Sequence, residues 1–148
     1  MSAMRLLVLG AVRRRGRAHG YQIRTDLEAY GAHEWSTATS GSIYHALKSM
    51  TAQGLLRMHD TGPSDAGGPP RTEYELTPQG EDAFFTMLRD ALSSRDPRLD
   101  LLTAAVGHLD DLPRDEAIAL LRIRADAMDA WQASITAHIP PGTDLDTW

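Results

Sequence analysis

The side chains best suited to bind another molecule lie along residues 39–53, which are predicted to form a helix. Ile43, Leu47 and Met50 recur at helical spacing, so they mark the side of this helix that is buried. The polar side chains at its N-terminus and on its outer side are Ser40, Ser42, Tyr44, His45 and Lys48. Such groups bind phosphates and the edges of bases in a DNA major groove. The alternatives are a solvated helix face and, for one of the two serines, a role in capping the helix only.

Arginine supplies almost all of the positive charge in the first part of the chain. Residues 1–24 contain six arginines and no acidic residue. We expect Arg15, Arg17 and Arg71 to contact DNA phosphates. The alternative for the first two is a solvated helix C-terminus, where positive charge favours the helix dipole. The net charge is −5, but residues 1–80 carry nine basic and seven acidic side chains, whereas residues 81–148 carry six and thirteen. Only the first half is therefore suited to face a polyanion.

Residues that would support catalysis or metal binding do not form a usable pattern. The chain has no cysteine, which excludes disulfides, thiolate zinc sites and a cysteine nucleophile. Its six histidines include no pair at i, i+4 spacing. The acidic pairs at residues 110–111 and 115–116 surround a predicted helix start, where negative charge is favourable, so capping explains them better than acid–base catalysis. We therefore predict no catalytic residues, no metal and no cofactor.

The order of the predicted elements would position the contact helix at a surface. Helices are predicted over residues 3–13, 21–30, 39–53 and 78–93, with strands over 55–61 and 71–76 and a turn-rich segment between the strands. Three short helices followed by a β-hairpin are typical of a winged helix-turn-helix, in which the second and third helices form the helix-turn-helix and the hairpin forms the wing. The predicted fold class is mainly α with a small β-hairpin.

Several short segments, in this order and spacing, resemble the PadR family of transcriptional regulators. They are HGYQI at residues 19–23, Trp35, SGSIYHAL at 40–47, QGLL at 53–56 and GGPPRTEYELTPQG at 67–80. The resemblance covers most of residues 5–82 and implies a homodimeric winged-helix repressor with a variable helical C-terminal region. It also implies release from DNA by a small, often aromatic compound. The chain departs from the family at Ser40 and His45, where the family usually has proline. It also lacks the basic residue that is usual near Thr72, so we expect the wing to attract phosphates less strongly.

The C-terminal part is predicted to be a helical arm. Residues 1–80 would form the DNA-binding domain, 81–139 the dimerisation and effector arm, and 140–148 a disordered tail. A heptad-like stripe in the arm runs through Ile118, Leu121, Ala125, Met128, Gln132 and Ile135. Such a seam favours pairing with a second helix. The predicted effector-binding residues are Trp35, Phe84, Leu88, Met128 and Trp131, for which core packing is the alternative.

The sequence as a whole predicts a DNA-binding transcriptional regulator. We expect a homodimeric repressor that binds a double-stranded DNA operator, is released by a small apolar or aromatic effector, and is not an enzyme. The apolar run at residues 6–12 is far shorter than the roughly 20 residues of a membrane span, so we expect a cytoplasmic protein without membrane association. The alternatives are a winged-helix protein-interaction module that does not bind DNA and a small-molecule-binding protein.

Overall fold

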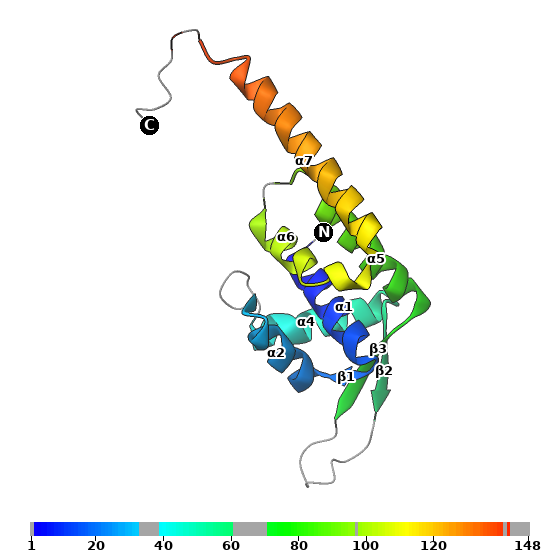
Figure 1. The fold of residues 1–148 in the computed structure, drawn as a ribbon. Helices are drawn as coiled ribbons and strands as arrows, with labels where there is room; N and C mark the ends of the chain where they lie inside the picture. The colour runs from blue at the N-terminus through cyan, green and yellow to red at the C-terminus, as the bar shows by residue number, and fades with distance from the viewer. Residues whose placement is uncertain (1, 33–38, 61–70, 97, 141, 143–148) are drawn as a thin grey trace.

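Helices and one small antiparallel sheet build the protein, as the sequence predicts (Figure 1). The computed structural model describes residues 2–32, 39–60, 71–96, 98–140 and 142. Trp35, the segment 62–70 and most of the predicted tail therefore lie outside the described residues. The elements are α1 (Ala3–Arg15), β1 (Ala18–His19), α2 (Gly20–Ala29), α4 (Ser40–Ala52), β2 (Leu56–Asp60), β3 (Thr72–Leu76), α5 (Pro78–Ser93), α6 (Leu99–Val106), the 3-10 turn η1 (Leu109–Asp111) and α7 (Arg114–Thr136).

The helix α1 lies at the centre of the fold. Its residues 6–12 are all buried, and it packs against α2, α4, α5 and α6. The apolar run at residues 6–12 spans nearly two helical turns, so apolar side chains face every side of the helix. A helix that is apolar on all sides is stable only when other elements surround it, and here both the helix-turn-helix and the arm pack on α1.

Capping interactions fix where α2 and α4 begin. His19 caps α2 and forms a reciprocal capping box with Gln22. Thr39 caps α4 in the same way with Ser42. In each box, two backbone N–H groups at the helix start donate hydrogen bonds to side-chain acceptors. The predicted start of the contact helix at residues 39–40 is confirmed, and Gly31 ends the α2 region with the positive φ expected there.

The sheet contains a strand that the sequence analysis did not predict. Its order is β1-β3-β2, with both pairs antiparallel. The predicted hairpin corresponds to β2 and β3, in which Leu56 pairs with Leu76. The additional strand is only two residues long, and Ala18 pairs with Tyr74. This pairing attaches the start of α2 to the base of the wing.

An arginine in α1 connects this central helix to α5 and η1. Arg13 forms ion pairs of 2.9 Å with Glu81 in α5 and with Asp111 in η1. Its guanidinium also lies over Phe85, 4.7 Å from the ring centroid. Partly buried multivalent contacts of this kind restrain the arm more than an isolated surface ion pair would.

The helices α5 and α7 run in the same direction. Arg89 of α5 contacts Glu116 of α7 at 2.6 Å. Further along, Arg124 donates hydrogen bonds to the backbone carbonyls of Ser94 and Asp96, just past the end of α5. The last turns of α7 therefore project beyond the rest of the fold (Figure 1). In the described part of the chain no helix is both long and apolar enough to cross a membrane.

The buried stripe of α7 differs in phase from the predicted seam. Ala117 is buried, Leu120 and Leu121 pack on the core, and Ile118 is exposed. Ile118 and Ala125 of the predicted seam are therefore exposed within the single chain, whereas Leu121 packs on the core. The pairing of this seam with a second helix stays a prediction.

Candidate nucleic-acid interface and an adjoining pocket

The outer side of α4 presents the polar side chains that the sequence predicts. Ile43, Leu47 and Met50 are buried against the core and fix the rotation of the helix. Tyr44, with 51% of its surface exposed, and the exposed His45 and Lys48 lie on the other side. This arrangement offers a phenol, an imidazole and an ammonium group along one side of a helix, which is the chemistry of major-groove contacts.

One of the two serines in the first turn of α4 forms hydrogen bonds within the helix cap. The hydroxyl of Ser42 donates to the Thr39 carbonyl at 2.9 Å and accepts from the Thr39 amide at 2.8 Å. The expectation that one of the two serines serves as part of the cap is thus fulfilled by Ser42. A phosphate contact by this residue stays a prediction, as does one by Ser40, whose side chain lies outside the described part.

The arginines predicted to bind phosphates have partners within the chain. Arg15 forms a bidentate ion pair with Asp26, at 2.6 and 2.8 Å, and the hydrogen bond to Asp26 raises the pKa of Arg15. Arg17 lies 3.6 Å from Glu73. The guanidinium of Arg71 lies 3.5 Å from the ring of His19. Their DNA contacts stay predictions, and Arg15 and Arg17 would have to leave or share a carboxylate to make them.

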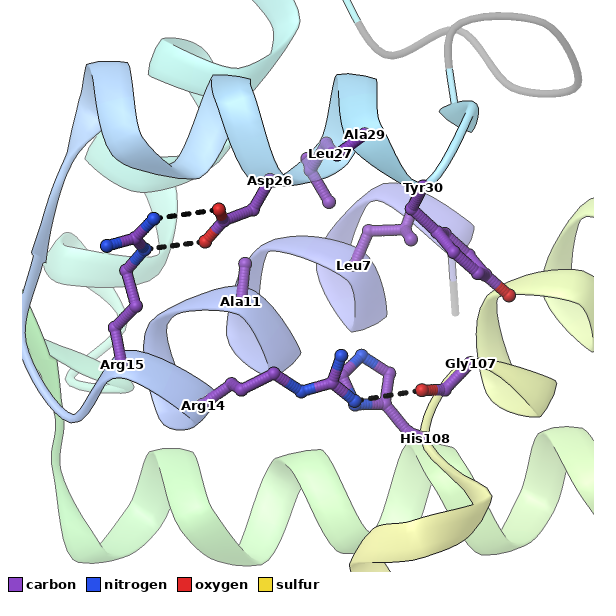
Figure 2. A pocket seen from close by; sticks show the side chains of 10 residues that line it. All are labelled: Leu7, Ala11, Arg14, Arg15, Asp26, Leu27, Ala29, Tyr30, Gly107 and His108. Carbon is purple, nitrogen blue, oxygen red and sulfur yellow. Dashed lines mark hydrogen bonds and ion pairs between the residues drawn. The ribbon is translucent and has the colours of Figure 1, made fainter.

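A cavity of about 490 Å³ lies between α1, α2 and the turn after α6 (Figure 2). Its lining residues are Leu7, Ala11, Arg14, Arg15, Asp26, Leu27, Ala29, Tyr30, Gly107 and His108. Figure 2 shows the Arg15–Asp26 pair at one end and Tyr30 at the other. The volume falls in the range of sites for small organic ligands, and mixed apolar and polar walls are typical of such sites.

The polar groups of this cavity are held in place by hydrogen bonds. Arg14 donates to the carbonyl of Gly107 at 2.9 Å, and its side chain is 59% exposed. His108 is buried and its Nδ1 lies 2.8 Å from a carboxylate oxygen of Asp111. Burial, the largest cause, lowers the pKa of His108 against the opposing effect of the Asp111 hydrogen bond. The hydroxyl of Tyr30 donates to the backbone carbonyl of Thr103.

The predicted effector residues are not brought together within one chain. Phe84 and Leu88 are fully buried core residues of α5, and Trp35 lies outside the described residues. Met128 and Trp131 lie on α7 beyond the end of α5. Phe84 precedes that end by about 14 Å, from the helical rise of 1.5 Å per residue. Of the four described residues, the two on α5 and the two on α7 therefore lie apart, and the effector site through all five stays a prediction.

Sequence reasoning missed the residues that line the cavity. They come from three segments, around residues 7–15, 26–30 and 107–108, and no spacing rule connects them. Arg14 and Arg15 are among the six arginines of residues 1–24, and Arg15 was predicted to contact DNA rather than to line a cavity. Among the described residues, no group of three or more histidine or acidic side chains is placed to hold a metal ion.

Comparison with known proteins agrees with this geometry. The family model "Transcriptional regulator PadR-like family" matches residues 8–85, and no curated protein matches the chain. Similar solved structures include Bacillus subtilis PadR in complex with operator DNA, with 19% identity, a TM-score of 0.54 and coverage of 96% of this chain and 82% of that one. A PadR family regulator from Clostridium difficile R20291 has 24% identity and a TM-score of 0.46, and the match covers 57% of this chain and 82% of that one. Bacillus subtilis PadR in complex with p-coumaric acid has 21% identity and a TM-score of 0.47, and the match covers 98% of this chain and 80% of that one.

Proposed function

The chain belongs to the PadR-like family of transcriptional regulators, and from this premise we propose that it is a homodimeric repressor released from operator DNA by a small aromatic effector. The observation that carries the DNA-binding part is the outer side of α4, where Tyr44, His45 and Lys48 are exposed while the opposite side is buried. A protein of the same fold, Bacillus subtilis PadR, is bound to operator DNA in its solved structure, which supports this use of the fold.

DNA binding is tested with fluorescent DNA from the region upstream of the protein's own gene. Wild-type protein should bind it more tightly than a scrambled duplex in moderate salt. Tyr44→Ala should weaken specific binding by about 1–3 kcal/mol if the contact to a base is direct, with an unchanged unfolding temperature. Absence of any binding by wild type would instead favour a winged-helix protein-interaction module.

The apolar stripe of α7 supports the homodimer. Its first half, from Ala117 to Leu121, packs within the chain. The same side of the helix continues through Trp131 and Ile135, which are 47% and 45% exposed beyond the end of α5. Large apolar side chains in a row are expected to be covered by a partner. A second copy with the same stripe would bury both rows in a symmetric contact.

The dimer is tested by placing charge on the uncovered part of the stripe. Trp131→Glu combined with Ile135→Glu should give a monomer in sedimentation equilibrium, because burying these charges costs more than the contact yields. Both positions are exposed in the single chain, so the fold should remain. DNA affinity should fall in parallel, since a single winged helix engages one half-site. A double variant that remains dimeric would move the interface to another surface.

In this proposal the effector binds in the cavity between α1, α2 and the turn after α6. Leu7, Ala11 and Leu27 provide apolar walls, Tyr30 provides an aromatic ring and Arg14 provides an exposed cation. A planar aromatic carboxylate matches these groups, because a ring can be buried while a guanidinium binds the carboxylate. To weaken operator affinity a thousandfold, the effector must bind the DNA-free conformation about 4 kcal/mol more favourably than the DNA-bound conformation.

The effector site is tested with hydroxycinnamate and its neutral amide as probes. Calorimetry should detect the carboxylate and not the amide, and the signal should disappear in Arg14→Leu, with Arg24→Leu as a control on the far side of α2. Ala11→Leu should block the cavity and leave DNA binding intact. If Trp131→Ala alone abolishes release, the effector lies on α7 as the sequence predicts. If no aromatic compound binds or releases, the protein is a ligand-independent regulator.

A further inference from the structure

Gly20 lies where an amino acid with a side chain would collide with the contact helix. It is the first residue of α2 and is buried. A Cβ atom at this position would lie 2.4 Å from Cε1 of Tyr44 and 2.8 Å from its hydroxyl oxygen. Gly20 is not among the glycines with positive φ, so its backbone conformation is open to any residue. The requirement for glycine here is one of space, and the ring of Tyr44 occupies that space.

The backbone of Gly20 is also held by contacts that do not involve α4. The preceding residue, His19, caps α2 and pairs with Glu73 of the wing in the sheet. Tyr44 reaches this backbone from α4 and also lies close enough to Tyr74 of β3 to contribute to the raised pKa of that residue, whose main cause is burial. The phenol of Tyr44 therefore lies against the junction between α2 and the wing, although about half of its surface is exposed.

We infer that Gly20 is a positioning residue for DNA recognition, because the missing side chain lets the Tyr44 ring rest against the start of α2 with its hydroxyl at a fixed point. This inference rests on the proposed DNA-binding function. A side chain at position 20 pushes the ring away, and the tyrosine must then be repositioned when DNA binds. The fold should tolerate the change, because the ring can move toward solvent and alanine is a better helix former than glycine.

The test is a double-mutant cycle with wild type, Gly20→Ala, Tyr44→Ala and the double variant, each titrated with the same operator duplex. Gly20→Ala should weaken binding to a similar extent as Tyr44→Ala, within the roughly 5–150-fold range of a direct base contact. In the Tyr44→Ala background, Gly20→Ala should change affinity by less than about twofold, because residues that act through one contact are not additive. The salt dependence of binding should be equal in all four proteins, since no charge is removed.

Stability is measured beside binding, and Gly41→Ala is the matched control for the stability measurement alone. Gly41 also lies in the first turn of a helix, but a Cβ there would meet nothing within 4 Å. If Gly20→Ala fails to fold, the removal of the Tyr44 ring in the double variant should restore folding, and a double variant that also fails to fold overturns the inference. An equal loss of affinity in both backgrounds, or no loss in either, overturns it as well. If wild type itself does not bind the duplex, the proposed function fails and this role fails with it.

Discussion

Lys48 provides a quantitative test of how α4 meets DNA. It is the only lysine in the chain, it is exposed, and it lies one turn after Tyr44 on the same side of the helix. Lys48→Ala removes one cation from each protomer and leaves the buried side of α4 unchanged. Alanine is a strong helix former, so the variant should keep its unfolding temperature.

The expected magnitude follows from counterion release. Each phosphate contact contributes about 0.9 to the slope of log affinity against log salt, so a dimer that loses two contacts should lose about 1.8 from this slope. Between 50 and 200 mM salt, this difference changes the ratio of wild-type to variant affinity by roughly tenfold. The loss of DNA affinity in Lys48→Ala should therefore be largest in low salt and smallest in high salt.

The assay is fluorescence anisotropy over that salt range with three variants. Lys48→Arg keeps the charge and should keep the slope. Arg122→Ala removes an exposed cation from α7 and should leave the slope unchanged, provided that sedimentation shows an intact dimer. DNA should also protect the single lysine from acylation, detected by mass spectrometry. An unchanged slope in Lys48→Ala, or acylation that DNA does not slow, would refute a phosphate contact by this residue.

Three further predictions concern stability. Gly10→Ala should destabilise the fold by about 1–3 kcal/mol, since its Cβ would lie 2.2 Å from Nε2 of the buried His108, and urea titration should show a smaller effect in a His108→Ala background. The pKa of His108 is lowered in the folded protein, so the unfolded chain binds the proton more readily. The free energy of unfolding should therefore be highest above about pH 6.5 and decrease as the pH falls below that value. His108→Gln should reduce this decrease. Thr39→Ala removes the cap of α4 and should cost about 1 kcal/mol in thermal unfolding.

Local signals in the sequence predicted the elements that carry the DNA-facing surface. Thr39 at a helix start and the spacing of Ile43, Leu47 and Met50 were sufficient to place α4 and its buried side. In the same way, the helix predicted over residues 78–93 matches α5, which Thr77 caps and in which Pro78 takes the first position. These signals succeed because caps and apolar periodicity act within a few residues of one another.

Features that depend on distant contacts were not predictable in this way. The strand β1 is two residues long and exists only because β3, more than fifty residues later, pairs with it. The packed side of α7 is set by where α5 ends and by the arginine contact to the carbonyl of Ser94. The cavity requires α1, α2 and residues 107–108 to converge. None of these has a period or motif of its own, so only the folded chain defines them.

The helix α2 connects the two parts of the proposed function. Gly20 at its first residue supports Tyr44 of the contact helix, while Asp26 and Tyr30 at its other end line the cavity. The ten residues of α2 form a helix about 15 Å long, so its two ends are connected by continuous backbone hydrogen bonds. A ligand that displaces Tyr30 or separates Asp26 from Arg15 therefore also acts on the backbone against which Tyr44 rests. In the proposed function, an effector in the cavity would therefore change the position of Tyr44 by displacing α2, without a rearrangement of the dimer.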